Sequence, residues 1–492
     1  MLSAGGSFAG IATRGLFFLK EDILSLSATE LLARMKCRDL SSSDLIEMTL
    51  DRIDKFNPQI NAIVSLDRER ALSAAAKADR RWKDGTAGSL EGIPVTIKDS
   101  FDVEGLPATA GSPLYRNRSD CADAPAVARL RQAGAIIIGK TNVSEMLGDL
   151  QSSNPLFGKT SNPNDLAYSA GGSSGGSAAS VAAGLSSFDL GSDLCGSIRW
   201  PAQSCGLFAL KPGWGVVPMF GHVPPPPGTR TLTELSTGGP FARSASDLGL
   251  IFSVLSGKSV ETAPVDRPLR VAVWTDEPLA PCEPEIFHAV VEAANRMREA
   301  GAIVDFAARP AFGFAEALEL FLLLVYRILA LGLSQVALAS LANTAKNTGS
   351  CDLTHASLRA RGSVLSDADW TILNLQRAKI QRDWASFFVE WDVVICPAAP
   401  RSAIKHNLSS EIHDRTVEIN GTKLPYFSLT NWSCLASIAD LPAAVVPFSS
   451  AAHNLPAGVQ IISATGKEAM ALKAARQLEQ HGFGYKAPKI LV

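Results

Sequence analysis

The sequence predicts an α/β protein with a single large domain, and two observations carry that prediction. Short β-rich runs alternate with helix-like segments, and the order strand, helix, strand occurs over 93–138 and again over 270–306. Because two parallel strands need a crossover connection of this kind, both stretches predict parallel pairing within one sheet. Across the 492 residues, no segment is rich enough in glycine, serine and proline to divide the chain, and no fixed-period repeat indicates a solenoid.

The composition is that of a folded protein that has no electrostatic reason to bind polyanions. Hydrophobic residues make up 46% of the chain and charged residues 19%, which is enough for a large core. The formal net charge of −2 gives no case for nucleic acid or an anionic membrane. The eight cysteines include no C-x-x-C pair, so we expect reduced thiols in a cytoplasmic protein, with no zinc site and no cofactor motif.

Two apolar stretches could be mistaken for targeting or membrane segments. Residues 1–26 are expected to be an N-terminal extension to a domain over 27–492, and the apolar run at 16–19 is too short for a signal-peptide core. Residues 317–334 contain Glu319 and Arg327, so they fall short of a membrane span. They predict a buried or pocket-capping helix, with an interfacial helix that receives an apolar substrate as the alternative.

The first 140 residues change from helices to the first crossover. Three helices are expected over 27–83: Ser27 or Thr29 caps the first, and Asn57-Pro58 ends the second. The pattern then predicts a strand over 93–97 that ends at Lys98, a helix over 124–133, a strand over 136–138 and a turn over 139–142.

The second half repeats the alternation. Strands are expected at 270–274, 303–306, 393–396, 443–448 and 457–462, with helices at 284–300, 366–389 and 466–480. The prolines at 224–227 predict a rigid loop.

The stretch 169–212 is the most informative part of the chain. It is rich in glycine and serine like a flexible linker, yet an apolar helix-like run, two aspartates and a single arginine interrupt it. Glycines in such a setting more often allow turns that a Cβ would block. This stretch therefore predicts the floor of an active site.

Two common active-site motifs do not fit this stretch. Gly171–Gly175 matches the G-x-S-x-G spacing of a nucleophile elbow, but the polar segment 162–170 shows no β character, and no motif requires any of the seven histidines. A phosphate-binding loop would need Gly-Lys-Ser/Thr where the chain has Gly176-Ser177-Ala178.

A serine with a lysine base fits better. Pro201 favours a helix that begins just after Ser197, where free backbone N–H groups could stabilise an oxyanion. A serine hydroxyl needs a base at neutral pH. Lys98 ends an apolar strand, and burial there would lower its pKa and supply neutral amine.

These residues resemble the amidase signature family of serine hydrolases. The motif segments are GGSSGGSAA at 171–179, DLCGSIRWP at 193–201, CGLFALKP at 205–212 and GIPVTIKD at 92–99. Further similar segments extend the resemblance from about residue 27 to the last helix. It implies a mixed, mostly parallel central sheet covered by helices on both faces.

The resemblance also implies a role for each site residue. Ser197 corresponds to the acylated nucleophile, Lys98 to the base, and Ser173 to a bridging serine that follows a cis peptide bond. The amides of Leu194, Cys195, Gly196 and Ser197 correspond to the oxyanion hole. Asp193 and Arg199 correspond to a buried pair bracing the nucleophile loop, and Ser174 to a supporting hydrogen bonder.

Two departures bear on the substrate. Cys195 stands where the family commonly has glycine. The family's amidotransferase subunits usually carry S-L-D-Q-I-G-P, whereas residues 233–240 read TELSTGGP and lack the aspartate of that motif. With the apolar 317–334 segment, this favours an amidase for aryl or alkyl amides, with carbamates or esters also open. The alternatives are an inactive binding protein and a glutamine-dependent amidotransferase subunit; a homodimer is left open.

Overall fold

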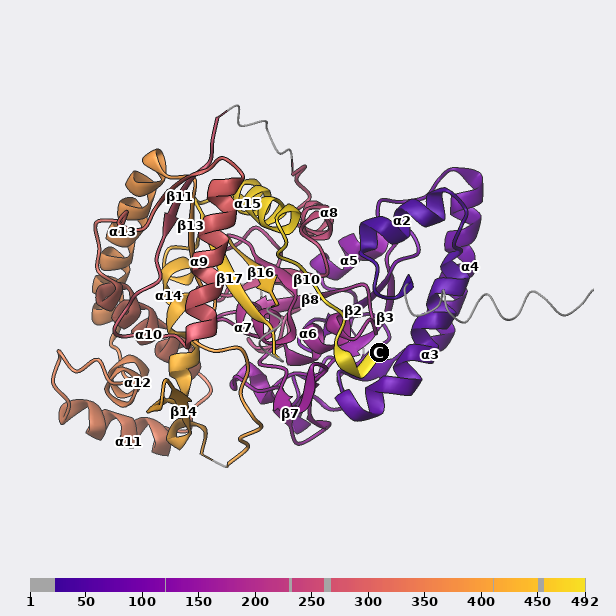
Figure 1. Cartoon of the computed structure of the whole chain (residues 1–492). Helices are drawn as coiled ribbons and strands as arrows, with labels where there is room; N and C mark the ends of the chain where they lie inside the picture. Colours follow the sequence, from indigo (N-terminus) through magenta and orange to yellow (C-terminus); the bar gives the residue numbers. More distant parts are fainter. Residues whose placement is uncertain are drawn as a thin grey trace, which may run out of the picture.

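A mixed sheet of eleven strands forms the centre of the computed structural model, which describes residues 23–119, 121–229, 232–260, 267–409, 411–449 and 455–491 (Figure 1). Most of the predicted extension, residues 1–22, lies outside these ranges. Across the sheet the strands are β1 (Ile63–Leu66), β3 (Ile136–Thr141), β2 (Pro94–Lys98), β8 (Phe188–Asp193), β10 (Thr237–Ala242), β9 (Phe208–Lys211), β16 (Ala443–Phe448), β17 (Ala457–Ser463), β13 (Val393–Pro397), β11 (Arg270–Val273) and β12 (Ile303–Asp305).

The sheet is mixed, as predicted, but it is not mostly parallel. Strands β3, β2 and β8 are parallel near one end, and β13, β11 and β12 are parallel at the other. Every pairing from β8 across to β13 is antiparallel, as is β1 with β3. The sequence prediction missed four strands of this sheet, β1, β8, β9 and β10. Of these, β10 and β9 lie with β16 and β17 between the two parallel parts.

Helices cover both faces of the sheet, as predicted. One face packs against α5 (Pro125–Gln132), α8 (Ala245–Ser256), α9 (Pro284–Glu299) and α15 (Glu468–Gln480). The other packs against α6 (Gly175–Ala182), α7 (Arg199–Cys205), α10 (Phe314–Ala330), α13 (Asp367–Glu390) and α14 (Cys434–Ser437). The remaining helices are α2 (Ala28–Lys36), α3 (Ser42–Ile60), α4 (Arg68–Asp84), α11 (Gln335–Lys346) and α12 (His355–Ser363).

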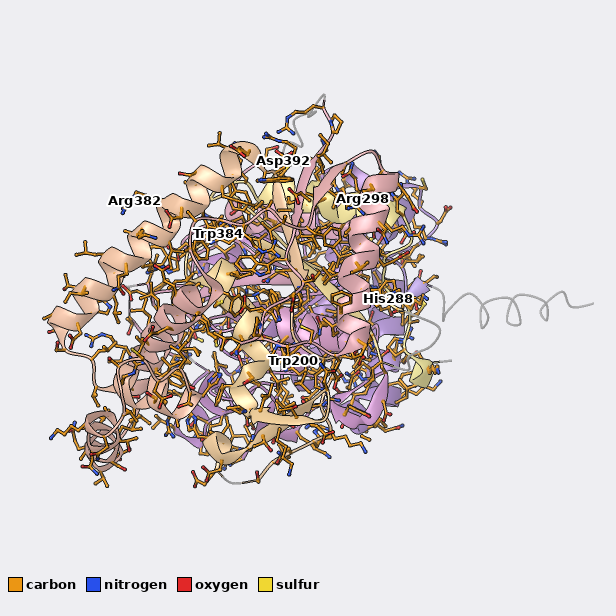
Figure 2. The ribbon with its side chains drawn as sticks, turned by 60° about the vertical axis from the view of Figure 1, so that its left-hand side comes forward. Trp200, His288, Arg298, Arg382, Trp384 and Asp392 are labelled. Carbon is orange, nitrogen blue, oxygen red and sulfur yellow. The ribbon has the colours of Figure 1, made fainter. Side chains whose placement is uncertain are left out.

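Different sets of helices lie at the two ends of the molecule. Figure 1 shows α3 and α4 at the end of the sheet near β3, and α10 to α13 at the opposite end. In Figure 2, Trp384 of α13 points into the molecule, whereas Arg382 points away from it. Trp384 is fully buried, so α13 is a covering helix with one apolar face. Within the described ranges, no helix is long and apolar enough to cross a membrane, α10 included.

Several predicted boundaries need correction. Ser27 caps α2 with a capping box, as expected, but α3 continues through Pro58 to Ile60. Proline keeps a helical φ, so it removes one hydrogen bond without ending the last turn. The stop comes from Asn61, whose φ of 56° is left-handed.

Residues 139–141 of the predicted turn over 139–142 are instead strand. β3 runs on to Thr141 because it has a partner on each side: Gly139 pairs with Leu66 of β1 and with Thr96 of β2. Ladder hydrogen bonds on both sides outweigh the local turn preference of glycine.

Short strands outside the main sheet correct another expectation. They are β4 (Ser153–Asn154), β5 (Gly158–Lys159), β6 (Ser161–Asn162), β7 (Asp165–Ser169), β14 (Thr416–Ile419) and β15 (Thr422–Pro425). The segment 162–170 therefore does contain a strand, β7, which pairs with β6. It lies outside the main sheet, so a nucleophile elbow at the top of that sheet is still not formed.

Candidate active site

The topology of the sheet brings the predicted site residues to one edge. β2 and β8 are neighbouring parallel strands, so Lys98 at the end of β2 lies beside the end of β8 at Asp193. α6 packs on both strands and leads into β8, so its N-terminus lies at that same edge. Ser173 lies two residues before this helix begins at Gly175. Parallel strands with a crossover helix therefore position all three groups.

Lys98 is fully buried and fully hydrogen-bonded. Its Nζ lies 2.7 Å from Ser173 Oγ, 2.9 Å from Ser192 Oγ and 3.3 Å from the Ser192 carbonyl oxygen. Burial lowers the pKa of Lys98 to about 7, although Asp193 and Asp189 act in the opposite direction. A large share of the amine is therefore neutral at physiological pH, as a general base requires.

The turn before α6 is shaped by contacts that a Cβ would block. The Gly172–Ser173 peptide bond is cis, as the resemblance implied. A Cβ on Gly172 would lie 2.6 Å from backbone atoms of Leu150 and Gln151. Ser174 donates to the Ser192 carbonyl at 3.2 Å, which ties the turn to the end of β8. Ser173 and Ser174 are therefore presented from a closely packed backbone.

Asp193 and Arg199 form a buried ion pair at the two ends of the loop 194–198, which contains Ser197. Both side chains are fully buried, and Arg199 Nη2 lies 2.9 Å from Asp193 Oδ1. Burial raises the pKa of Asp193, but the charge and hydrogen bonds of Arg199 outweigh it and hold that pKa well below its usual range. Asp193 also accepts hydrogen bonds from the amides of Gly196 and Ile198. The pair thus fixes the loop on both sides of Ser197.

The predicted oxyanion amides are not equivalent. The Gly196 amide donates to Asp193 Oδ1 at 2.8 Å, so in this structure it is already paired and not free to bind an oxyanion. Within the described part of the chain, the amides of Cys195 and Ser197 have no hydrogen-bond acceptor. We therefore retain Cys195 and Ser197, with Leu194 beside them, as the candidate donors.

Cys195 is compatible with the loop because the left-handed position belongs to its neighbour. Gly196 has a φ of 96°, whereas Cys195 is not among the residues with positive φ. Its Sγ lies 3.4 Å from Thr430 Oγ1, and burial raises the pKa of the thiol to about 11. Cys195 is thus a poor nucleophile at neutral pH.

Ser197 lines a mostly apolar pocket. The pocket is lined by Leu147, Gly148, Asp149, Leu150, Leu194, Cys195, Ser197, Leu322, Val325, Tyr326, Leu329 and Phe427. Four of these come from α10, which confirms the predicted pocket-capping helix. Among the hydrogen bonds of the described residues, none joins Ser173 to Ser197.

Asp149 is the one carboxylate among the described residues of the pocket wall, and its charge is compensated. Arg415 Nη1 lies 2.6 Å from Asp149 Oδ2, and the Tyr426 hydroxyl donates to Oδ1 at 2.7 Å. Sequence reasoning missed these residues because they come from loops far apart in the chain, with no motif around them.

Sequence reasoning also missed Ser192 and His222. Ser192 contacts Lys98, and His222 contacts Ser192 at 2.9 Å between Nε2 and Oγ. Ser192 lies inside the glycine- and serine-rich stretch, so its position was a usable signal. No sequence signal indicated His222, because it precedes the predicted proline loop and only the fold brings it to the site.

A buried neutral amine, serine hydroxyls and unpaired amides at one edge of an α/β sheet are the features of a serine-dependent acyl hydrolase. Comparison with known proteins gives the family. The family model described as Amidase matches residues 44–472. The chain belongs to the amidase signature family, and its activity is hydrolysis of amide C–N bonds.

The relatives with known names include two kinds of enzyme. A glutamyl-tRNA(Gln) amidotransferase subunit of Lachnospira eligens is 30% identical over 489 residues, which is 93% of this chain and 98% of that protein. An indoleacetamide hydrolase of Bradyrhizobium diazoefficiens is 30% identical over 476 residues, which is 94% of this chain and 87% of that protein.

Solved structures agree with this fold. A crystal structure of an amidase covers 93% of this chain and all of its own, with a TM-score of 0.75 and 26% identity. A bacterial aryl acylamidase of the amidase signature family covers 93% of this chain and 96% of its own, with a TM-score of 0.76 at 24% identity. The latter supports the fold alone.

Proposed function

We propose that the protein hydrolyses a small, largely apolar amide through an acyl-enzyme on Ser197. The observation that carries this proposal is the pocket that Ser197 lines, whose wall consists mostly of leucine, valine and aromatic side chains. Such a wall favours an aryl or alkyl group by removing it from water. Carbamates and esters remain possible substrates, since they react through the same acyl chemistry.

The base in the proposed cycle is the neutral form of Lys98. It takes a proton from Ser173, which takes one from Ser197 as Ser197 attacks the carbonyl carbon. The 2.7 Å contact between Lys98 and Ser173 supports the first transfer. The second transfer requires the two serine hydroxyls to approach when substrate binds.

The developing oxyanion is proposed to be held by the amides of Leu194, Cys195 and Ser197. Unpaired amides in a water-excluded site are effective because they need no reorganisation during the reaction. The same relay then returns a proton to the departing amine. Water attacks the acyl-enzyme, releases the acid and restores Ser197.

Glutamine suits this pocket less well than an apolar amide. A zwitterionic amino acid needs charged partners, and the carboxylate of Asp149 is already paired with Arg415. The aspartate of the amidotransferase motif corresponds to Ser236 in this chain, the residue just before β10 begins at Thr237. An amidotransferase role remains the second candidate because several similar relatives carry that name.

The deciding experiment is a hydrolysis panel with the wild type and two variants. The panel contains anilides, arylacetamides including indole-3-acetamide, aliphatic amides, carbamates, esters and glutamine. We expect the aryl or alkyl amides to give the highest kcat/KM. Ser197→Ala should abolish turnover, and Lys98→Ala should reduce it by about 10³-fold or more, as loss of a general base does. Near-normal rates in either variant would contradict the mechanism.

Each alternative has its own outcome in the same experiment. Release of ammonia from glutamine only with a partner protein would favour the amidotransferase role. No reaction with a serine-directed fluorophosphonate would favour an inactive binding protein. We place the enzyme in the cytoplasm, and the support is that all eight cysteines are free thiols.

A further inference from the structure

His222 is a buried histidine held against the segment that follows Lys98. It lies in the connection between β9 and β10 and is 7% exposed. The backbone around it bonds to residues just after Lys98: Asp102 N donates to Gly221 O at 2.8 Å, and Val223 N donates to Ser100 O at 2.7 Å. Its ring packs edge-on against Phe101, with centroids 4.8 Å apart. The fold therefore fixes this ring relative to the proposed base.

The hydrogen bonds of His222 determine which ring nitrogen carries the proton. Nδ1 lies 2.8 Å from the Pro224 carbonyl oxygen, which can only accept, so Nδ1 is the donor. Burial, with repulsion from Lys98, lowers the pKa of His222 to about 3, so the ring is neutral. Nε2 is therefore unprotonated, and at 2.9 Å it accepts the hydroxyl hydrogen of Ser192.

This assignment constrains the amine of Lys98. Because the hydrogen of Ser192 is directed to His222, Ser192 Oγ can only accept from Lys98 Nζ at 2.9 Å. The Ser192 carbonyl oxygen, 3.3 Å away, is also only an acceptor. A neutral amine has two N–H groups and one lone pair. Both N–H groups are thereby assigned, and the lone pair is left for the hydroxyl of Ser173, 2.7 Å away.

We infer that His222 is a positioning residue that acts through Ser192 to direct the lone pair of Lys98 toward Ser173. Without the acceptor at Nε2, the Ser192 hydroxyl can rotate and donate to that lone pair, in competition with Ser173. The inference rests on the proposed role of Lys98 as the base. Asp193 and Asp189, the acidic groups that act on Lys98, are left unchanged by substitutions at His222.

Three substitutions separate the acceptor from the packing of the ring. His222→Phe keeps an aromatic ring against Phe101 and removes both nitrogens. His222→Asn is too short to reach Ser192. His222→Gln can place an amide oxygen near the position of Nε2. Each variant is assayed for kcat and KM with the best amide of the panel, and its fold is checked by thermal unfolding.

We expect the Phe and Asn variants to lose about tenfold or more in kcat, with KM within about twofold, because the defect lies in orientation of the base. The Gln variant should recover most of the rate. In the Phe variant, donation from Ser192 stabilises the neutral amine, so the acid limb of the pH–rate profile should move to lower pH. The His222→Gln variant should return the acid limb to its wild-type position. A Phe or Asn variant with wild-type kcat, or a Gln variant as slow as Phe, would overturn the inference.

A double-mutant cycle tests the route through Ser192. In a Ser192→Ala background no hydroxyl can compete for the lone pair, so His222→Phe should cause no further loss. If the losses in kcat from His222→Phe and Ser192→Ala multiply in the double variant, His222 does not act through Ser192. The failure of the proposed function is distinguishable: it would show as retained activity in Ser197→Ala or Lys98→Ala, whatever the His222 variants do.

Discussion

The floor and the wall of the active site are built on different principles. The floor comprises the turn at 171–174, β8 and the loop 194–199. Its charged and polar side chains are buried and form hydrogen bonds or ion pairs with one another, as Asp193 and Arg199 do. In the wall, α10 presents the apolar side chains of Leu322, Val325 and Leu329 to the pocket. A polar network fails when one partner is removed, whereas an apolar surface tolerates replacement. We therefore propose that the floor carries the chemistry and that the wall selects the substrate.

The largest expected effect comes from breaking the floor at Asp193. Asp193→Asn leaves the buried guanidinium of Arg199 without a counter-charge, which should cost about 3–5 kcal/mol in the free energy of unfolding. Chemical denaturation measures this loss, and kcat should fall by at least about 100-fold as the loop relaxes.

The matched control is Asp54→Asn, which removes one partner of the exposed ion pair with Arg68. Exposed pairs contribute little, so the change should stay below about 1 kcal/mol. Equal losses in the two variants would show that the buried pair does not brace the floor.

The next effect is the pH dependence of the base. Because the neutral amine is the active form, kcat/KM should rise with pH and level off above the Lys98 pKa of about 7. Below that value the rate should fall tenfold per pH unit. A flat profile between pH 5.5 and 8.5, measured about every half unit, would contradict the assignment of Lys98.

Asp189 provides the control for that profile. Burial raises its pKa to about 7 as well, so it titrates in the same range. Asp189→Asn should keep the acid limb and move it to lower pH, since a charge that favours protonated Lys98 is removed. If the limb disappears in Asp189→Asn, the aspartate and not the lysine is the group that titrates.

A smaller effect is expected in the wall. Leu322→Ala enlarges the pocket, so the ratio of kcat/KM for a bulkier over a smaller acyl group should rise by about 3- to 30-fold. The same ratio in Val336→Ala, an 81% exposed position on α11, should match the wild type. An unchanged ratio in Leu322→Ala would exclude α10 from substrate selection.

The smallest effect is expected at Cys195, where floor and wall meet. Since this residue does not need a positive φ, Cys195→Gly should leave kcat within about threefold. The raised pKa of its thiol also predicts slow alkylation by iodoacetamide at pH 7.5, compared with the exposed Cys37 and Cys351. Mass spectrometry of the alkylated protein measures this, and rapid loss of activity on alkylation of Cys195 would contradict it.

The sequence by itself determined the parts of the protein that depend on local pattern. The α/β class follows from alternating strand and helix runs, and the capped start of α2 follows from Ser27. The family and the candidate triad follow from short motif segments at 92–99, 171–179 and 193–201, whose glycines permit close backbone contacts, as at Gly172. In these cases the physical cause lies within a few residues of its effect.

Only the tertiary structure decided the features that depend on contacts between distant segments. Strands β9 and β10 make the centre of the sheet antiparallel, and Gly139 is held in a strand by partners on both sides. Arg415 meets Asp149 across 266 positions of sequence, and His222 reaches Ser192 across 30. No local pattern encodes such pairings, because a side chain's partner is set by how the elements pack. The tertiary structure thus showed how the fold places His222 and Ser192 around the base predicted from sequence.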